Sequence, residues 1–302
     1  MEDILVKAVA KGVRAYGIVS TGVVREAVRR HKLSSLAAAA LGRTMTGALL
    51  LSQTLKNKEA VTLKIAGDGP LGKITADATP EGAVRGFVEN PSLELPLNSA
   101  GKLDVGRGVG KGFLFLTRFT GLKEPVTGSA ELVTGEIAED ITNYLYVSEQ
   151  TPSSVGLGVL MDKDGDCNAA GGFFLQTLPD IDEDTLLIIE ENIKNLPAVS
   201  TLIDEGADGE AILKLLLKGV DDFELLTKTN VAFRCQCKRE RIEEVLISTG
   251  EKELKSLIAD GHAEVVCHFC GEKYEFNKED LEMLLRVAVK AKEIKKGNIN
   301  TL

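Results

Sequence analysis

The sequence contains few histidines and few cysteines, two residue types that enzymes often use for acid–base and nucleophilic chemistry. Its 302 residues include only three histidines and five cysteines. Neither a Ser-His-Asp set nor a catalytic pair of carboxylates can be assembled from the pattern, although covalent catalysis needs a positioned base beside its nucleophile. We therefore expect a protein that is not an enzyme.

A long uninterrupted apolar run is also missing. A membrane-spanning helix needs about 20 predominantly apolar residues, and the nearest candidate, Ser34–Leu55, is interrupted by Arg43 and made largely of small residues. The first residues, MEDILVKAVAKG, lack the apolar block and cleavage site of a signal peptide. These absences predict a cytoplasmic protein with no membrane partner. In that compartment clustered cysteines indicate metal ligands or redox centres before structural disulfides.

The charge balance shows no basic excess. The formal net charge is −9, and residues 180–230 hold 13 acidic residues and 4 lysines, so this one segment carries the whole acidic excess. Nothing in this balance favours nucleic acid or an anionic membrane as a partner.

What is present predicts an α+β protein with more than one domain, because 302 residues exceed the usual size of a single core. The N-terminal segment, 1–179, is expected to be a mixed core domain with an antiparallel sheet. An acidic helical linker at 180–230 and a small zinc-binding module at 231–293 follow. Residues 294–302 are expected to form a flexible tail.

The prediction for the N-terminal domain depends on alternating patterns and turn residues. Val13–Ser20 and Gly112–Phe119 suit strands, and several short runs between turns predict an antiparallel meander. Two helices are expected at Val23–His31 and Leu36–Leu55, the second behind a serine cap. A further helix is expected in EIAEDITNYLYVSEQ.

Three short helices are expected in the acidic linker, at Glu183–Leu196, Val199–Glu205 and Glu210–Leu217. Their apolar faces are strong and their polar faces are mostly acidic. Such helices cannot form a core alone, so they must pack on something else, and self-repulsion should make that packing marginal. An ordinary helical subdomain remains the alternative.

Four of the five cysteines form two close pairs, Cys235/Cys237 and Cys267/Cys270, with the spacing C-x-C-x29-C-x-x-C. Tetrahedral zinc needs four soft ligands at about 2.3 Å, and two pairs brought together by a fold supply them. Gly271 can adopt the positive φ that turns backbone amides toward sulfur in a zinc knuckle. We predict one Zn²⁺ per chain, held by these four thiolates.

Two histidines near the cysteines, His262 and His268, are expected to stand outside the ligand set, because four thiolates complete a zinc site. Each cysteine pair is close enough in sequence for a disulfide within itself, although a C-x-C ring is tight. The spacing permits such a redox switch without requiring it, and chemistry alone favours a purely structural zinc site.

Three other features are interpreted as structural. Cys167 lies in an apolar strand pattern and is expected to be a buried small hydrophobe. VGRGVGKGF, at Val105–Phe113, departs from a phosphate-binding loop at Val105 and at Gly112, and is expected to be a glycine-rich loop. DKDGD, at Asp162–Asp166, lacks the ligand spacing of a calcium loop and predicts a hairpin turn.

Several long stretches of the sequence resemble the thirty-three-kilodalton heat-shock protein family, the redox-regulated holdase chaperones of bacteria. They are RRHKLSSLAAAALGRTMTGALLL, GEIAEDITNYLYVSEQTPSSVGLGVLMDKDG, AAGGFFLQTLP, NIKNLPAVSTLI and the C-x-C…C-x-x-C tail. The resemblance covers the chain from Asp3 to about Val289, and the extension after Lys290 has no counterpart.

The resemblance implies a mechanism. The reduced, zinc-bound protein is expected to be inactive. Oxidation would pair Cys235 with Cys237 and Cys267 with Cys270 as redox-active disulfides, release zinc, and unfold the C-terminal module and the adjoining linker. Homodimers would then form and bind unfolding client proteins on exposed apolar surface. We further expect that the acidic helices cover an apolar face of the N-terminal sheet before this release.

Two other classes remain as alternatives. A structural zinc ribbon could bind protein or nucleic acid, but residues 231–276 contain 7 basic and 9 acidic residues, which opposes a nucleic-acid partner. A thiol-disulfide oxidoreductase would place its C-x-x-C at a helix start in a βαβ pattern, whereas Cys267 and Cys270 lie between the strand-like runs AEVV and KYEF.

Overall fold

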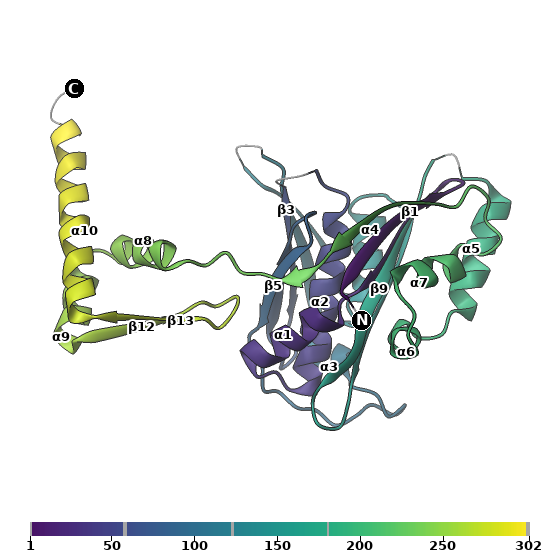
Figure 1. Cartoon of the computed structure of the whole chain (residues 1–302), viewed down its shortest axis with the longest axis horizontal. Helices are drawn as coiled ribbons and strands as arrows, with labels where there is room; N and C mark the ends of the chain where they lie inside the picture. The colour runs from purple at the N-terminus through teal and green to yellow at the C-terminus, as the bar shows by residue number, and fades with distance from the viewer. Residues whose placement is uncertain (1, 57–58, 122–123, 180, 300–302) are drawn as a thin grey trace. The chain divides into compact units, whose positions relative to one another are not determined.

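The computed structural model describes residues 2–56, 59–121, 124–179 and 181–299. It divides into two compact units, Met1–Arg234 and Cys235–Leu302. Both mix helices with antiparallel sheet, so the predicted α+β class is confirmed (Figure 1).

The first sheet of unit 1, sheet A, is antiparallel throughout and has the strand order β10-β1-β2-β9-β8. Its strands are β1 (Ile4–Ala10), β2 (Val13–Val19), β8 (Ser153–Met161), β9 (Cys167–Thr177) and β10 (Glu224–Asn230). Both faces of β2 and β9 are largely buried, because each face of the sheet packs on helices.

The second sheet, sheet B, has the order β11-β5-β4-β3-β6-β7. Its strands are β3 (Ala60–Gly67), β4 (Lys73–Ala78), β5 (Ala83–Val88), β6 (Gly112–Phe119), β7 (Val126–Glu131) and β11 (Ala232–Phe233). Strands β3 to β5 show every second residue buried, as in a sheet with one face on a core. Only β11 pairs in parallel, and its partner is β5.

Helix α2 (Ser35–Ser52) lies between the two sheets and forms the centre of unit 1 (Figure 1). Its small residues allow close approach from both sides, and the Ser34 side chain caps its first turn. By length and composition this helix alone, among described residues, could cross a membrane, but 89% of it is buried in the protein, as in a core helix. Arg43, which interrupts the apolar run, is paired with Glu136.

Three further helices complete this part of unit 1: α1 (Thr21–His31), α3 (Val105–Val109) and α4 (Ala138–Val147). The positions of α1 and α4 confirm the expected helices. Helix α3 corrects the expected glycine-rich loop at Val105–Phe113. Asp104 caps it by accepting a hydrogen bond from the Arg107 amide at 3.1 Å, and the rest of that stretch enters β6.

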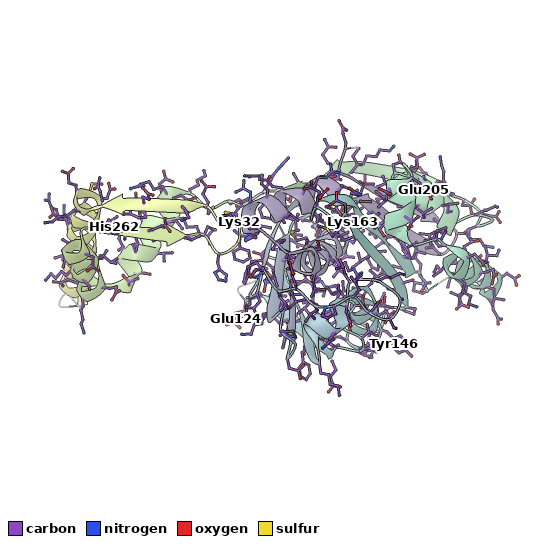
Figure 2. The ribbon with its side chains drawn as sticks, turned by 90° about the horizontal axis from the view of Figure 1, so that it is seen from below. Lys32, Glu124, Tyr146, Lys163, Glu205 and His262 are labelled. Carbon is purple, nitrogen blue, oxygen red and sulfur yellow. The ribbon has the colours of Figure 1, made fainter. Side chains whose placement is uncertain are left out.

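The acidic segment forms α5 (Glu183–Asn195), α6 (Val199–Asp204) and α7 (Gly209–Leu216), which confirms the three predicted helices. Their apolar residues pack on the face of sheet A opposite α2, with Ile212, Leu213 and Leu216 fully buried. The expected covering of an apolar sheet face is therefore present, while acidic side chains such as Glu205 stay exposed (Figure 2). The segment is not helical to its end, since its last residues form strand β10.

Unit 2 contains the hairpin β12 (His262–Val266) and β13 (Lys273–Asn277), which confirms the two expected strands, and three helices. Helices α8 (Arg239–Thr249) and α9 (Glu251–Asp260) were not expected from the sequence. Helix α10 (Lys278–Ile299) continues past 293, so 294–299 of the expected flexible tail are helical. The rest of the tail, 300–302, lies outside the described residues.

Candidate metal centre

The four clustered cysteines come from two segments of unit 2. Cys235 and Cys237 lie in the stretch before α8, whereas Cys267 directly follows β12 and Cys270 lies in the turn that leads to β13. The register of the hairpin places Val266 opposite Lys273, so both ends of this turn are held together by the ladder.

The turn at the second pair has the backbone of a metal knuckle. The amides of Cys270 and Gly271 both donate to the Cys267 carbonyl, at 3.3 and 2.8 Å, and the Cys267 amide donates to the Glu272 carbonyl at 2.8 Å. Gly271 has φ +70°, the left-handed conformation predicted for it. This compact turn holds both sulfurs of the pair on one side of the hairpin end.

The fold brings all four sulfurs together, with every Sγ within 4.8 Å of the others. The Sγ atoms of Cys235 and Cys267 are 3.8 Å apart, and those of Cys237 and Cys270 are 3.3 Å apart. A tetrahedron with metal–sulfur bonds of about 2.3 Å has sulfurs about 3.8 Å apart. None of these cysteines, all within the described residues, is in a disulfide. The four cysteines could therefore hold a metal ion, and their donor set and spacing fit zinc.

Burial of the sulfur cluster disfavours the charged thiolate form unless a positive charge lies close to the sulfurs. Burial raises the pKa of the Cys270 thiol well above its ordinary value and also raises that of Cys237. Cys270 is only 2% exposed. Four thiolates packed this closely would repel one another, whereas a divalent cation at their centre offsets both the burial and the repulsion.

Neither nearby histidine belongs to the cluster that the structure forms. His262 starts β12 at the end of the hairpin remote from Cys267, opposite Asn277. His268 lies within the knuckle but its side chain is exposed. The group of possible metal ligands found among described residues consists of cysteines alone.

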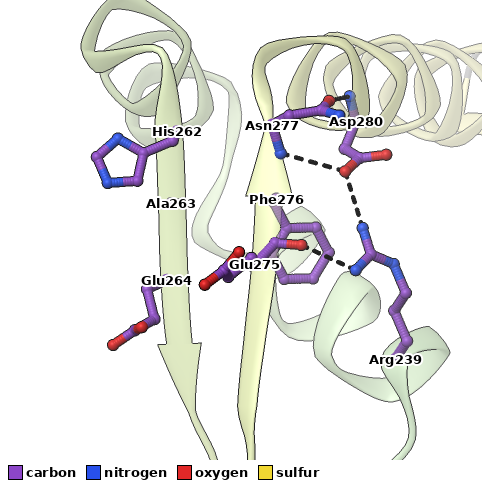
Figure 3. A pocket seen from close by; sticks show the side chains of 8 residues that line it. All are labelled: Arg239, His262, Ala263, Glu264, Glu275, Phe276, Asn277 and Asp280. Carbon is purple, nitrogen blue, oxygen red and sulfur yellow. Dashed lines mark hydrogen bonds and ion pairs between the residues drawn. The ribbon is translucent and has the colours of Figure 1, made fainter.

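A separate open pocket of about 580 Å³ lies at the His262 end of the hairpin (Figure 3). Arg239 crosses it, donating to the Glu275 carbonyl and to the Asp280 carboxylate, both at 2.8 Å, with its guanidinium over the Phe276 ring. At the start of α10 the Asn277 amide donates to the Asp280 carboxylate, and the Asp280 amide donates to the Asn277 side-chain oxygen, as in a capping box. These contacts join α8, β13 and α10, so the pocket is a structural junction of unit 2.

Two other predictions concern unit 1. Cys167 is buried, as expected, and burial raises the pKa of its thiol to about 12, so it stays protonated and unreactive at neutral pH. Asp162–Asp166 forms the expected hairpin turn, with the Asp162 carboxylate accepting from the amides of Asp164 and Asp166, both at 2.9 Å. Lys163 marks this turn in Figure 2.

Comparison with known proteins gives one consistent result. A family model described as "Hsp33 protein" matches residues 3–277. A protein of Desulforamulus reducens named "33 kDa chaperonin" is 48% identical over 289 residues, which cover 95% of this chain and 98% of the relative. One of the same name from Listeria innocua is 47% identical over 293 residues, 95% of this chain and all of the relative.

The crystal structure of a 33 kDa chaperonin from Thermotoga maritima is similar to the whole fold. It superposes with a TM-score of 0.90 at 40% identity, covering 96% of this chain and 99% of that one. Sequence and fold thus agree over both units of the chain.

Proposed function

This chain belongs to the Hsp33 family, as its sequence resemblance predicted, and from that premise we propose that it is a molecular chaperone whose binding of unfolding proteins is switched by oxidation of its four clustered cysteines. The family membership and the names of the relatives support the chaperone activity. The single observation that supports the switch is the meeting of four sulfurs from two distant segments at one point.

In the resting form we propose that Cys235, Cys237, Cys267 and Cys270 hold one Zn²⁺ as thiolates. The ion supplies a tetrahedral cross-link between the stretch before α8 and the hairpin end. We propose that unit 2 depends on this link, because the core formed by its described residues contains six buried hydrophobic side chains: Leu246, Leu254, Ala263, Phe276, Leu281 and Leu284. Zinc binding in small modules corresponds to about 10–16 kcal/mol of folding free energy.

In the activated form we propose disulfides within each pair, Cys235–Cys237 and Cys267–Cys270. Hydrogen peroxide takes two electrons from each pair of thiolates, so an S–S bond forms and the O–O bond breaks. Its two oxygens leave as hydroxide, which takes protons from solvent to become water. In the structure, sulfurs of different pairs also approach one another, at 3.8 Å for Cys235 and Cys267 and at 3.3 Å for Cys237 and Cys270, so all four surround one centre. Closing a disulfide within each pair therefore draws the sulfurs away from their common centre, and unit 2 loses its cross-link.

The acidic helices of unit 1 are the segment that we propose is released next. Helices α5, α6 and α7 cover an apolar face of sheet A that includes Val6, Ala15 and Phe173. The segment 180–230 has a net charge of −9, and its self-repulsion opposes this packing. Release would expose both the sheet face and the apolar sides of the helices, which are surfaces suited to unfolding clients.

Further parts of the proposal concern the setting in which the protein acts. We propose that the oxidised protein is a homodimer, that it works in the cytoplasm without a membrane or nucleic-acid partner, and that it catalyses no reaction. The acidic balance of 231–276 supports the lack of a nucleic-acid partner.

The experiment measures zinc content and suppression of aggregation of a thermally unfolding protein, before and after peroxide treatment with mild heating. We expect zinc release and a gain of suppression to occur together. Full suppression by the reduced, zinc-loaded protein would contradict the switch and favour a structural zinc module with a constitutive binding surface.

A further inference from the structure

One extended segment of unit 1 completes both sheets. Residues 224–234, called the strap here, pair first with β1 in antiparallel register, from Val9–Glu224 to Ile4–Asn230, and then with β5 in parallel register. The strap thus covers one edge of sheet A and one edge of sheet B in succession (Figure 1). Without it, β1 and β5 would both be edge strands.

Main-chain hydrogen bonds hold the strap where it passes from one sheet to the other. The Val231 amide donates to the Asp3 carbonyl at 3.0 Å, and the Ala232 amide donates to the Gly82 carbonyl at 2.9 Å. The Arg234 amide donates to the Val84 carbonyl at 2.8 Å. These bonds depend on an extended backbone and not on the identity of the side chains.

Side chains contribute little along the first part of the strap. In β10 only Leu225 and Thr229 are partly buried, and the other five residues are exposed, including Leu226 at 43%. The apolar anchors come later: Val231 is buried in the main core, and Phe233 packs beside Arg30. An extended segment with more apolar side chains could therefore occupy the β1 edge at least as well as β10 does.

The strap is tied to the two elements that the proposed switch releases. Lys228 forms an ion pair with Glu210 of α7 at 2.9 Å, and Glu210 also binds Lys214. At its other end, Arg234 is followed directly by Cys235. Loss of the α7 packing would therefore remove the ion pair of Lys228, and loss of the sulfur cross-link would release the residue that follows Arg234.

We propose that release of the strap turns the edges of β1 and β5 into docking sites for extended segments of unfolding proteins, which bind by adding a strand to each sheet. This inference rests on the proposed function and specifies how clients are recognised. Strand addition takes its affinity from the backbone, which every unfolded chain presents, and a vacated edge is a ready template for such pairing. The strap itself shows that both edges accept an extended chain.

Hydrogen exchange on the full-length protein tests this proposal. The probe is reduced, carboxymethylated α-lactalbumin, which stays unfolded in buffer. Oxidation is expected to speed exchange of the strap amides by about tenfold or more and to open amides of β1 and β5. Adding the probe to the oxidised protein should restore protection in β1 and β5 but not in the strap.

Three outcomes would contradict the proposal, and they are distinguishable. If the probe binds while β1 and β5 stay open, clients bind elsewhere and only this inference fails. It also fails if the strap regains protection together with the two strands, since the strap has then returned. If the oxidised protein neither binds the probe nor suppresses aggregation, the proposed function fails as well.

A pair of matched peptides separates backbone pairing from apolar contact. One has the strap sequence ELLTKTNVAFR, and the other is N-methylated at the amides that correspond to Val231, Ala232 and Arg234, so it keeps every side chain but loses three donors. Only the unmethylated peptide should displace labelled probe from the oxidised protein. Equal displacement by both peptides, or by neither, would contradict strand addition.

Discussion

The two units of this chain are stabilised in different ways. Among the described residues, the main core of unit 1 contains 37 buried residues gathered around α2, whereas the core of unit 2 contains six. A large apolar core is enough to fold a domain, but a module with so few buried side chains needs a cross-link or a metal. This difference fits the proposed switch, in which unit 1 stays folded while unit 2 unfolds on oxidation.

The acidic segment, 180–230, combines an apolar packing surface with an excess of negative charge. Its helices bury apolar residues on sheet A as an ordinary core would, yet its charge is predominantly negative. Its apolar packing holds the helices on sheet A in this structure, while its self-repulsion opposes that packing.

Removal of the metal is expected to give the largest difference between the units. Cys270→Ser, or a chelator applied to the reduced protein, should unfold unit 2, because binding free energies of about 10–16 kcal/mol are typical of small zinc modules. Hydrogen exchange should show loss of protection across α8 to α10 and little change in α2. Cys167→Ala is the matched control, since it removes a buried thiol that lies outside the cluster. If unit 2 stays protected from exchange after metal removal, its fold does not depend on the metal, and the contrast with unit 1 fails.

A core substitution in unit 1 should destabilise unit 1 and leave unit 2 unchanged. Leu49 is fully buried in α2, so Leu49→Ala should lower the free energy of unfolding of unit 1 by about 2–5 kcal/mol. Denaturation followed by circular dichroism measures this loss, and zinc content should stay the same. Met283→Ala, at a side chain that is 65% exposed, is expected to be nearly neutral. A loss of zinc in Leu49→Ala would show that the two units are not independent.

Two glycine substitutions test the contact that keeps the strap on β5. Gly82 and Gly165 have nearly equal φ values, +85° and +87°. A Cβ at Gly82 would lie 2.3 Å from the Asn230 carbonyl oxygen, whereas nothing lies within 4 Å of one at Gly165. Both alanine variants should lose about 1–2 kcal/mol through backbone strain. Only Gly82→Ala should also speed exchange of the Val231, Ala232 and Arg234 amides, and equal exchange in both variants would contradict the contact.

The smallest expected effect concerns pH and the start of the acidic segment. The Asp182 carboxylate binds Lys11 at 2.6 Å and caps α5, and these contacts lower its pKa from 3.8 to about 2. A lowered pKa in the folded state stabilises the protein above the unfolded value, so this contribution is lost as pH falls from about 4 toward 2. Exchange in α5 should rise over that range, and Asp182→Asn should remove this part of the pH dependence. If exchange in α5 rises over the same pH range in Asp182→Asn, the pH dependence comes from other carboxylates.

Most helices and strands of unit 1 could be predicted because their apolar residues recur with the period of the element that they form. The misses have identifiable signals. Helix α3 is short and glycine-rich, and only the Asp104 cap indicates it. Helices α8 and α9 lie in a charged stretch with one fully or nearly fully buried side chain each, Leu246 and Leu254, so their apolar stripes are weak.

The candidate site was predictable in composition but not in geometry. The spacing of Cys235, Cys237, Cys267 and Cys270 indicates two pairs of soft ligands. Spacing along the chain does not show that sulfurs of different pairs approach to 3.8 and 3.3 Å. That arrangement depends on how the stretch before α8 meets the end of a hairpin, which involves residues about 30 positions apart.

By itself, the sequence determined the local properties of this protein: the ligand type and the knuckle turn, the amphipathic helices, and the concentration of acidic charge in 180–230. Each of these depends on side chains within a few turns of one another. Only the tertiary structure decided that α2 lies between two sheets, which of these sheets the acidic helices cover, and that the strap pairs with both β1 and β5. Strand pairing and burial join residues that are far apart in the chain. Backbone hydrogen bonds are the same for every side chain, so the sequence gives little indication of which strands pair.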